Sequence, residues 1–183
     1  MKTPITELIE VLIQMLPEDE YIDPVGKVLV DALKRGNAII TCGNGGSATD
    51  ASHLVEELTG KYKKVRRPLP GFCMNSDAAA ITCIANDFGF ENVFVRQLAA
   101  LAKPGDVLVA FSTSGNSPNI INALADAHRY KVSTVLLTGR DGGNAAKVAD
   151  HVIYVPSDNT ARIQEAHTLI LHNFLEQIEH ESL

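Results

Sequence analysis

The sequence predicts a single α/β domain in which helices cover both faces of a five-stranded parallel sheet, a doubly wound arrangement. Three observations lead to this prediction. Short runs rich in β-branched residues alternate with helical patterns along most of the 183 residues. Each run is nearly continuous in apolar residues rather than alternating, as expected when both faces of a strand are buried. No linker, low-complexity tract or internal repeat interrupts the chain, so residues 1–183 form one domain.

The strands are expected in short segments bounded by Gly, Pro, Asp or Asn, which favour turns. They are "NAIITC" (37–42), "LPGFCMN" (69–75), "DVLVAF" (106–111), "STVLLT" (133–138) and "HVIYVP" (151–156). Helical patterns fill the remaining chain, at about 3–16, 22–35, 47–60, 77–85, 90–102, 117–129, 143–149 and 160–180. The first two form an N-terminal helical segment at about 3–35, ahead of the first strand.

Composition and charge exclude several classes of protein. The net charge of -6 argues against nucleic-acid binding by phosphate neutralisation. We expect no membrane partner, because neither a secretory leader nor a bilayer-length apolar run is present. Three widely spaced cysteines without metal-binding spacing are typical of free thiols in a reducing cytoplasm. The basic run "KYKKVRR" (61–67) is interpreted first as a solvated helix end or loop and second as a sugar-phosphate or partner contact.

Ligands of doubly wound domains bind beyond the carboxyl ends of the strands, which directs attention to three turns. "STSGNS" (112–117) offers four hydroxyls, and the helix that follows it presents free backbone N–H groups to an anion. The hydroxyls belong to Ser112, Thr113, Ser114 and Ser117. They favour a phosphate monoester, although Ser117 followed by Pro118 also matches an ordinary helix start.

The other two turns carry weaker signals. "GNGGS" (43–47) is compatible with a ligand loop and equally with a tight turn capped by Ser47. It has neither the glycine spacing of a dinucleotide fingerprint nor the lysine of a P-loop, so no nucleotide cofactor is expected. "TGRDGG" (138–143) is interpreted as a turn rather than a site.

Helical periodicity places Asp50, His53 and Glu57 on one stripe of the helix 47–60, with Glu56 on the flank of His53. A histidine and a glutamate at i and i+4 can share a metal or a substrate, and can equally form a solvated surface pair.

The last helix has an apolar face of Ile163, Ala166, Ile170, Phe174 and Ile178. Its polar flank repeats at spacing four with Gln164, Thr168 and His172. Ligands from two helices could complete a tetrahedral site, although glutamine is an uncommon zinc ligand. The remaining histidines are interpreted as structural or surface residues: His128, His151, His167 and His180.

Five segments together resemble the sugar isomerase (SIS) domain family and, within it, the phosphoheptose isomerases. They are "GNGGSATDASHLVEELTGKY", "ANDFGFENVF", "GDVLVAFSTSGNS", "LTGRDGG" and "ARIQEAHTLILH", in this order over about 36–180. The resemblance implies a Rossmann-like three-layer sandwich that assembles as a homotetramer. It also implies interconversion of sedoheptulose 7-phosphate and D-glycero-D-manno-heptose 7-phosphate through an enediol, toward lipopolysaccharide or other surface glycans.

Site residues follow from the same resemblance, position by position. It implies substrate contacts from Asn44, Gly45, Gly46, Glu57, Asn86, Asp87, Ser112, Thr113, Ser114, Ser117 and Gln164. It implies one zinc ion per subunit, bound by His53, Glu57, Gln164 and His172, with Glu57 and His172 as the acid–base pair. Two positions depart from the family pattern: Lys61 replaces an arginine and Ala161 an aspartate.

Two other functions stay open at this stage. A non-catalytic SIS tetramer could bind a replication initiator protein, and "TARIQEAH" (160–167) resembles such relatives. An isomerase or sensor of another sugar phosphate is the other alternative, because a fold does not fix a substrate.

Overall fold

The computed structural model describes residues 2–16 and 19–181. Its strands are β1 (Ile39–Gly43), β2 (Gly71–Cys73), β3 (Val107–Ser112), β4 (Ser133–Gly139) and β5 (His151–Val155). Its α-helices are α1 (Pro4–Met15), α2 (Asp19–Lys34), α3 (Gly46–Thr59), α4 (Ala78–Phe88), α5 (Val93–Leu101), α6 (Pro118–Ala127) and α7 (Thr160–His180).

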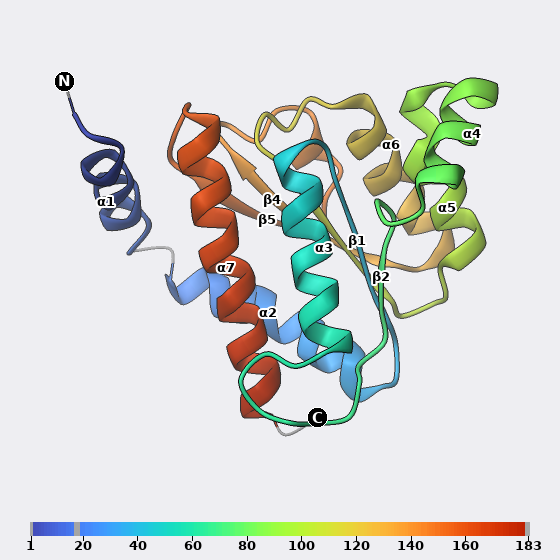
Figure 1. Ribbon diagram of the computed structural model, residues 1–183, viewed down its shortest axis with the longest axis horizontal. Helices are drawn as coiled ribbons and strands as arrows, with labels where there is room; N and C mark the ends of the chain where they lie inside the picture. The colour runs from blue at the N-terminus through green and yellow to red at the C-terminus, as the bar shows by residue number, and fades with distance from the viewer. Residues whose placement is uncertain (1, 17–18, 182–183) are drawn as a thin grey trace.

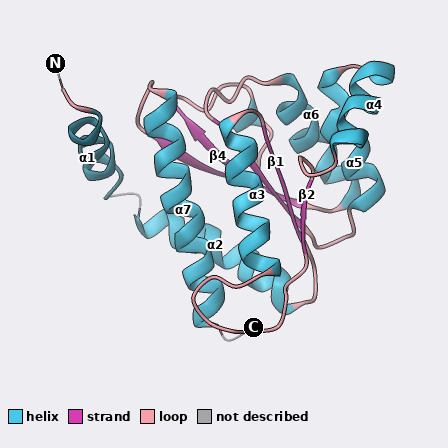
Figure 2. Ribbon diagram, viewed as in Figure 1, coloured by secondary structure: helices cyan, strands magenta, loops and turns pink. Residues whose placement is uncertain are grey.

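The five strands form one parallel sheet in the order β2-β1-β3-β4-β5, which confirms the predicted fold class. Strand order reverses between β1 and β3, whose following helices lie on opposite faces of the sheet (Figures 1 and 2). This reversal makes the carboxyl ends of β1 and β3 the topological switch point, where such sheets bind ligands.

Neighbouring apolar residues along a strand point to opposite faces of the sheet and pack into two separate cores. Ile39 faces the core beneath α2, α3 and α7, whereas Ile40 faces the core beneath α5 and α6. Strand β3 divides in the same way, with Phe111 in the first core and Ala110 in the second. Burial of both faces explains the continuous apolar runs of the central strands. Among the described residues, no helix combines the length and apolar character needed to cross a bilayer.

Three details differ from the expected elements. The expected strand 69–75 pairs only over Gly71–Cys73 and is only partly buried, because β2 is an edge strand. The expected helix 143–149 is a short 3-10 helix, Ala145–Lys147, which follows two glycines with positive φ. The expected helix 90–102 divides into the 3-10 helix Phe90–Asn92 and α5.

His167 lies in the core between α7 and the sheet, as a structural residue. Its ring is fully buried and meets the Phe111 ring edge-on at 6.0 Å. Neither ring nitrogen has a hydrogen-bond partner within geometric limits among the described residues. Burial lowers the pKa of His167 from 6.5 to about 4, and the nearby Thr138 backbone opposes part of this change.

This burial predicts an acid-dependent loss of stability. Between pH 6.5 and 4 the unfolded chain binds a proton that folded His167 does not, so the free energy of unfolding decreases as pH decreases. The two pKa values correspond to about 3 kcal/mol. In urea unfolding at several pH values, His167→Leu should show a flatter pH dependence than the wild type. His180→Leu, at an exposed histidine of the same helix, should keep the wild-type slope; equal slopes in all three proteins would contradict the prediction.

Candidate active site between α3 and α7

Helices α3 and α7 lie side by side on one face of the sheet (Figure 1). The polar stripe of α3 is therefore directed toward α7 rather than toward bulk solvent. Asp50 is only 8% exposed, and the Thr168 hydroxyl donates a hydrogen bond of 3.0 Å to its Oδ1. Burial raises the pKa of Asp50, while Thr168 and then His53 lower it. The Asp50 end of this stripe is thus buried against α7 rather than solvated.

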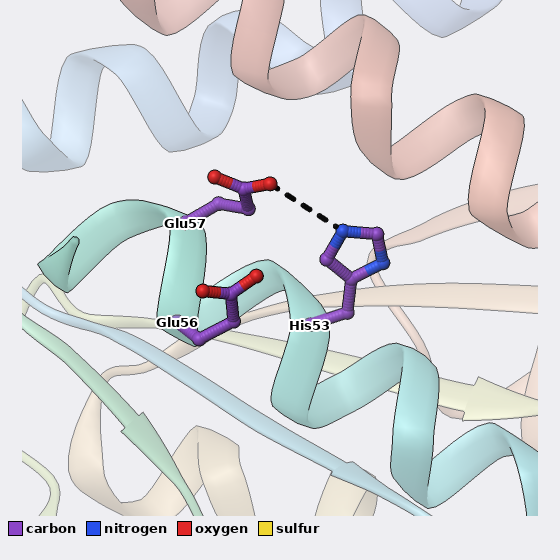
Figure 3. A group of neighbouring side chains, drawn as sticks. All are labelled: His53, Glu56 and Glu57. Carbon is purple, nitrogen blue, oxygen red and sulfur yellow. Dashed lines mark ion pairs between the residues drawn. The ribbon is translucent and has the colours of Figure 1, made fainter. Parts of the chain in front are cut away.

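His53, Glu57 and His172 come together where the two helices face each other. His53 Nε2 lies 3.6 Å from Glu57 Oε1, and the two side chains are 32% and 16% exposed (Figure 3). The His53 and His172 rings meet edge-on with centroids 5.0 Å apart. Burial, and next the proximity of His53, lower the pKa of His172, so its ring is neutral at pH 7.

Glu56 also lies near His53. One ligand atom from each of His53, Glu56 and Glu57 falls within 4.8 Å of the others, so geometry alone admits either glutamate as a metal ligand. Glu56 is exposed, however, and only Glu57 forms an ion pair with His53 (Figure 3). Glu57 also raises the pKa of His172 through its charge. These contacts favour Glu57, as the sequence periodicity predicts.

Gln164 reaches the first turn of α3 from α7. Its amide lies so close to Gly46 that a Cβ at this position would be 2.6 Å from Gln164 Nε2. The helix begins at Gly46 with Gly45 as N-cap, so the predicted N-cap role of Ser47 is wrong. Ser47 is buried inside the first turn. Gly46 therefore leaves room for a glutamine from a distant segment.

Tyr62 is a site residue that the sequence interpretation missed. Its ring stacks on the His172 ring at 5.5 Å with an interplanar angle of 20°. Glu179 accepts hydrogen bonds from the backbone N–H groups of Lys63 and Lys64, which fastens this loop to α7. Arg66 donates to the Glu57 and Leu58 carbonyls at the end of α3. The basic run is thus a loop that is bound to α7 and to the end of α3. Within this run, Tyr62 is the residue whose side chain stacks on a candidate site residue.

The hydroxyl-rich loop lies where the sequence predicts, between β3 and α6. Ser112 ends the strand, Ser117 is the N-cap residue of α6, and Pro118 is its first residue. The Ser117 side chain makes no capping hydrogen bond. Ordinary capping therefore does not account for this hydroxyl, which favours the anion-binding interpretation.

Asn44 is held by a residue that the sequence interpretation did not single out. Its amide exchanges two hydrogen bonds of 2.9 Å with the amide of Asn119 in α6. Asn119 is the second residue of α6, and no motif in the sequence marks it as a partner of Asn44.

Asn86 and Asp87 are not brought to this group within one chain. They lie near the end of α4, which packs against α5 on the opposite side of the sheet from α3 and α7 (Figure 1). Their side-chain contacts are local: Asn86 donates to Asp87 at 2.7 Å.

The residues of α3 that face α7 include a group that could hold a divalent metal: ligand atoms of His53, Glu56 and Glu57 lie within 4.8 Å of one another, and imidazole and carboxylate are ligands that zinc accepts. His172 of α7 is not in this group, but its ring lies 5.0 Å from the His53 ring. Burial lowers the pKa of His172, which favours the neutral imidazole that a metal requires of a histidine ligand.

The fold and this site define a class of protein. A doubly wound domain carries a hydroxyl-rich loop at its switch point and places His53, Glu57 and His172 between two adjacent helices on one face of the sheet. The SIS domain family matches residues 4–139.

The chain belongs to the SIS domain family and, within it, to the phosphoheptose isomerases. It is 49% identical to the phosphoheptose isomerase of Aliarcobacter butzleri over 88% of this chain and 86% of that protein. The phosphoheptose isomerase structure from Neisseria gonorrhoeae superposes with a TM-score of 0.91 at 38% identity, covering 96% of this chain and 95% of that one. The phosphoheptose isomerase structure from Francisella tularensis superposes with a TM-score of 0.92 at 35% identity, covering 95% of this chain and 93% of that one.

The contacts of the glycine-rich turn predict opposite outcomes for two alanine substitutions. In Gly46→Ala the new methyl meets the flexible end of Gln164, so Gln164 should rotate away while the melting temperature stays within about 4 °C of wild type. In Gly43→Ala the methyl meets the backbone of Ser47, which cannot move aside, so this variant should be strongly destabilised. Thermal melts and a crystal structure of Gly46→Ala test both. If both variants lost similar amounts of melting temperature and Gln164 did not move in Gly46→Ala, the contact between Gly46 and Gln164 would be contradicted.

Proposed function

We propose that the protein is an aldose–ketose isomerase that converts sedoheptulose 7-phosphate to D-glycero-D-manno-heptose 7-phosphate. The observation that carries the proposal is the convergence of His53, Glu57 and His172 between α3 and α7. Identity of 49% to a named phosphoheptose isomerase supports the substrate class. The phosphate group is assigned to the loop 112–117, and the sugar chain to the space between this loop and α3.

The reaction moves a carbonyl from C2 to C1 of the sugar. A base removes a proton from C1, an enediol forms, and a proton is returned to C2. We assign the base to Glu57, whose carboxylate is mostly buried beside two imidazoles. His172 transfers protons between the two substrate oxygens, and its neutral ring can both accept and donate a proton.

We propose zinc as the metal, held by His53, Glu57, Gln164 and His172. The chemistry that zinc supplies when bound is polarisation of the substrate carbonyl. Asp50 and Tyr62 contact the helix pair around these residues and hold it in place. Asn44 and the backbone of Gly45 and Gly46 orient the sugar from the turn that begins α3.

The assembly and cellular context are part of the same proposal. A homotetramer would let Asn86 and Asp87, which lie across the sheet in one chain, serve a neighbouring subunit's site. Helix α4 supports this assignment because none of its residues is buried in the isolated chain. A cytoplasmic location is consistent with three free cysteines. The product would supply heptose for lipopolysaccharide or other surface glycans.

Substitution of the two adjacent glutamates tests the proposal. Glu57→Gln removes the base and should lower kcat by at least about 100-fold, while keeping the fold. Glu56→Gln is the matched control: it changes the same residue type one position away and should keep kcat within about threefold of wild type. Conversion of sedoheptulose 7-phosphate is measured by product analysis, with and without added zinc.

Three results would count against this function. The first is a wild-type protein that yields no aldose phosphate with or without zinc. The second is equal loss of activity in both glutamine variants. The third is faster turnover of hexose phosphates than of the heptulose phosphate at equal concentration. This result would identify another sugar phosphate as the substrate.

A further inference from the structure

Asn44 and Asn119 form a reciprocal amide pair that joins the turn after β1 to helix α6, across 75 residues of sequence. Asn44 Nδ2 donates to Asn119 Oδ1 at 2.9 Å, and Asn119 Nδ2 donates to Asn44 Oδ1 at 2.9 Å. Asn119 is 1% exposed, and its Oδ1 also accepts the Ile120 backbone N–H at 3.0 Å. Two neutral hydrogen bonds in a buried position fix the plane of both amides.

The pair lies at the switch point of the sheet. Asn44 directly follows β1, and Asn119 is the second residue of α6, behind the hydroxyl loop that follows β3. Strands β1 and β3 are neighbours, and their following helices diverge to opposite faces. The amide pair therefore spans the crevice from the turn that leads into α3 to the helix behind the phosphate loop.

A second asparagine holds the same turn from the other side. Asn75, after β2, accepts a hydrogen bond from the Gly43 N–H at 3.1 Å and donates to the Gly43 carbonyl at 2.8 Å. The end of β1 and the turn that follows it are thus tied to the segment after β2 and to α6. Asn75 contacts this turn only through the Gly43 backbone, whereas Asn119 binds the Asn44 side chain itself.

The hydrogen-bond capacity of the two amides assigns different roles to them. Asn119 is buried, and its oxygen accepts two hydrogen bonds. Asn44 is half-buried and uses one of its two N–H groups and one of its two lone pairs in the pair. The pair therefore presents a defined N–H and a defined lone pair of Asn44 to the crevice.

We propose that Asn119 is a positioning residue that orients Asn44 toward the sugar and fixes its distance from the phosphate loop. This inference rests on the proposed function, because it takes the phosphate at 112–117 and the sugar at Asn44. Asn119 acts only through Asn44, so its effect on catalysis must vanish when the Asn44 side chain is absent.

A double-mutant cycle tests this dependence. Asn119→Ala should lower kcat/KM for sedoheptulose 7-phosphate about tenfold, since two neutral hydrogen bonds are lost. In the Asn44→Ala background the same substitution should change kcat/KM by less than about twofold. Asn119→Asp is a nearly isosteric second variant, which keeps the acceptor, loses the donor and should also lower kcat/KM. Asn122→Ala is the matched control, because this exposed asparagine of α6 donates to the Glu91 carbonyl and should behave as wild type.

Amide hydrogen exchange of residues 43–47 gives a second readout that is independent of activity. Asn119→Ala should accelerate exchange in this turn, and Asn122→Ala should not. Equal losses of kcat/KM in the wild-type and Asn44→Ala backgrounds would overturn the inference, as would unchanged kinetics of folded Asn119→Ala. If wild type lacks isomerase activity, the proposed function fails, and unchanged exchange in Asn119→Ala would then overturn the positioning role separately.

Discussion

The packing of α7 against α3 is the contact on which the candidate active site depends. The apolar face of α7, including Ile163, Ala166 and Ile170, is fully buried and holds the helix to the sheet. The hydrogen bond from Thr168 to Asp50 then sets how the polar sides of the two helices meet. Burial of a carboxylate is unfavourable, as the raised pKa of Asp50 shows, and one hydroxyl donor offsets only part of that cost. The hydrogen bond between Thr168 and Asp50 is therefore better understood as fixing the position of α7 along α3 than as adding to the free energy of unfolding.

The sheet provides the second constraint, because it determines which loops meet. Strands β1 and β3 pair along the whole of β1, so their following loops start at the same edge. One loop leads to α3 and the other to α6, on opposite faces. Hydrogen bonds between Asn44 and Asn119 join the two sides, and α3 carries His53 and Glu57 away from this edge. A single strand-order reversal thus brings the hydroxyl-rich loop and the start of α3 to the same edge.

Local sequence patterns were sufficient to predict the strands, the main helices and the pairing of His53 with Glu57 rather than Glu56. Periodicity determines which side chains share a helical face, and continuous apolar runs mark central strands. The same patterns could not place Tyr62 against His172 or Asn119 against Asn44, because each contact joins segments far apart in the chain. They also predicted too long an edge strand at 69–75, where sheet pairing rather than composition sets the length.

The charge of the protein restricts how a phosphate can be bound. The net charge is -6, and the basic run 61–67 follows the far end of α3, where Arg66 binds helix carbonyls and Lys63 binds Glu176 at 2.6 Å. At the proposed phosphate site, attraction would therefore come mainly from hydroxyls and from backbone N–H groups at the start of α6, where the helix dipole favours an anion. Donors of this kind act at short range and in fixed directions, so they require a rigid loop. In the proposed function, the contacts that hold the loops at the switch point would consequently be as important for phosphate recognition as the hydroxyls themselves.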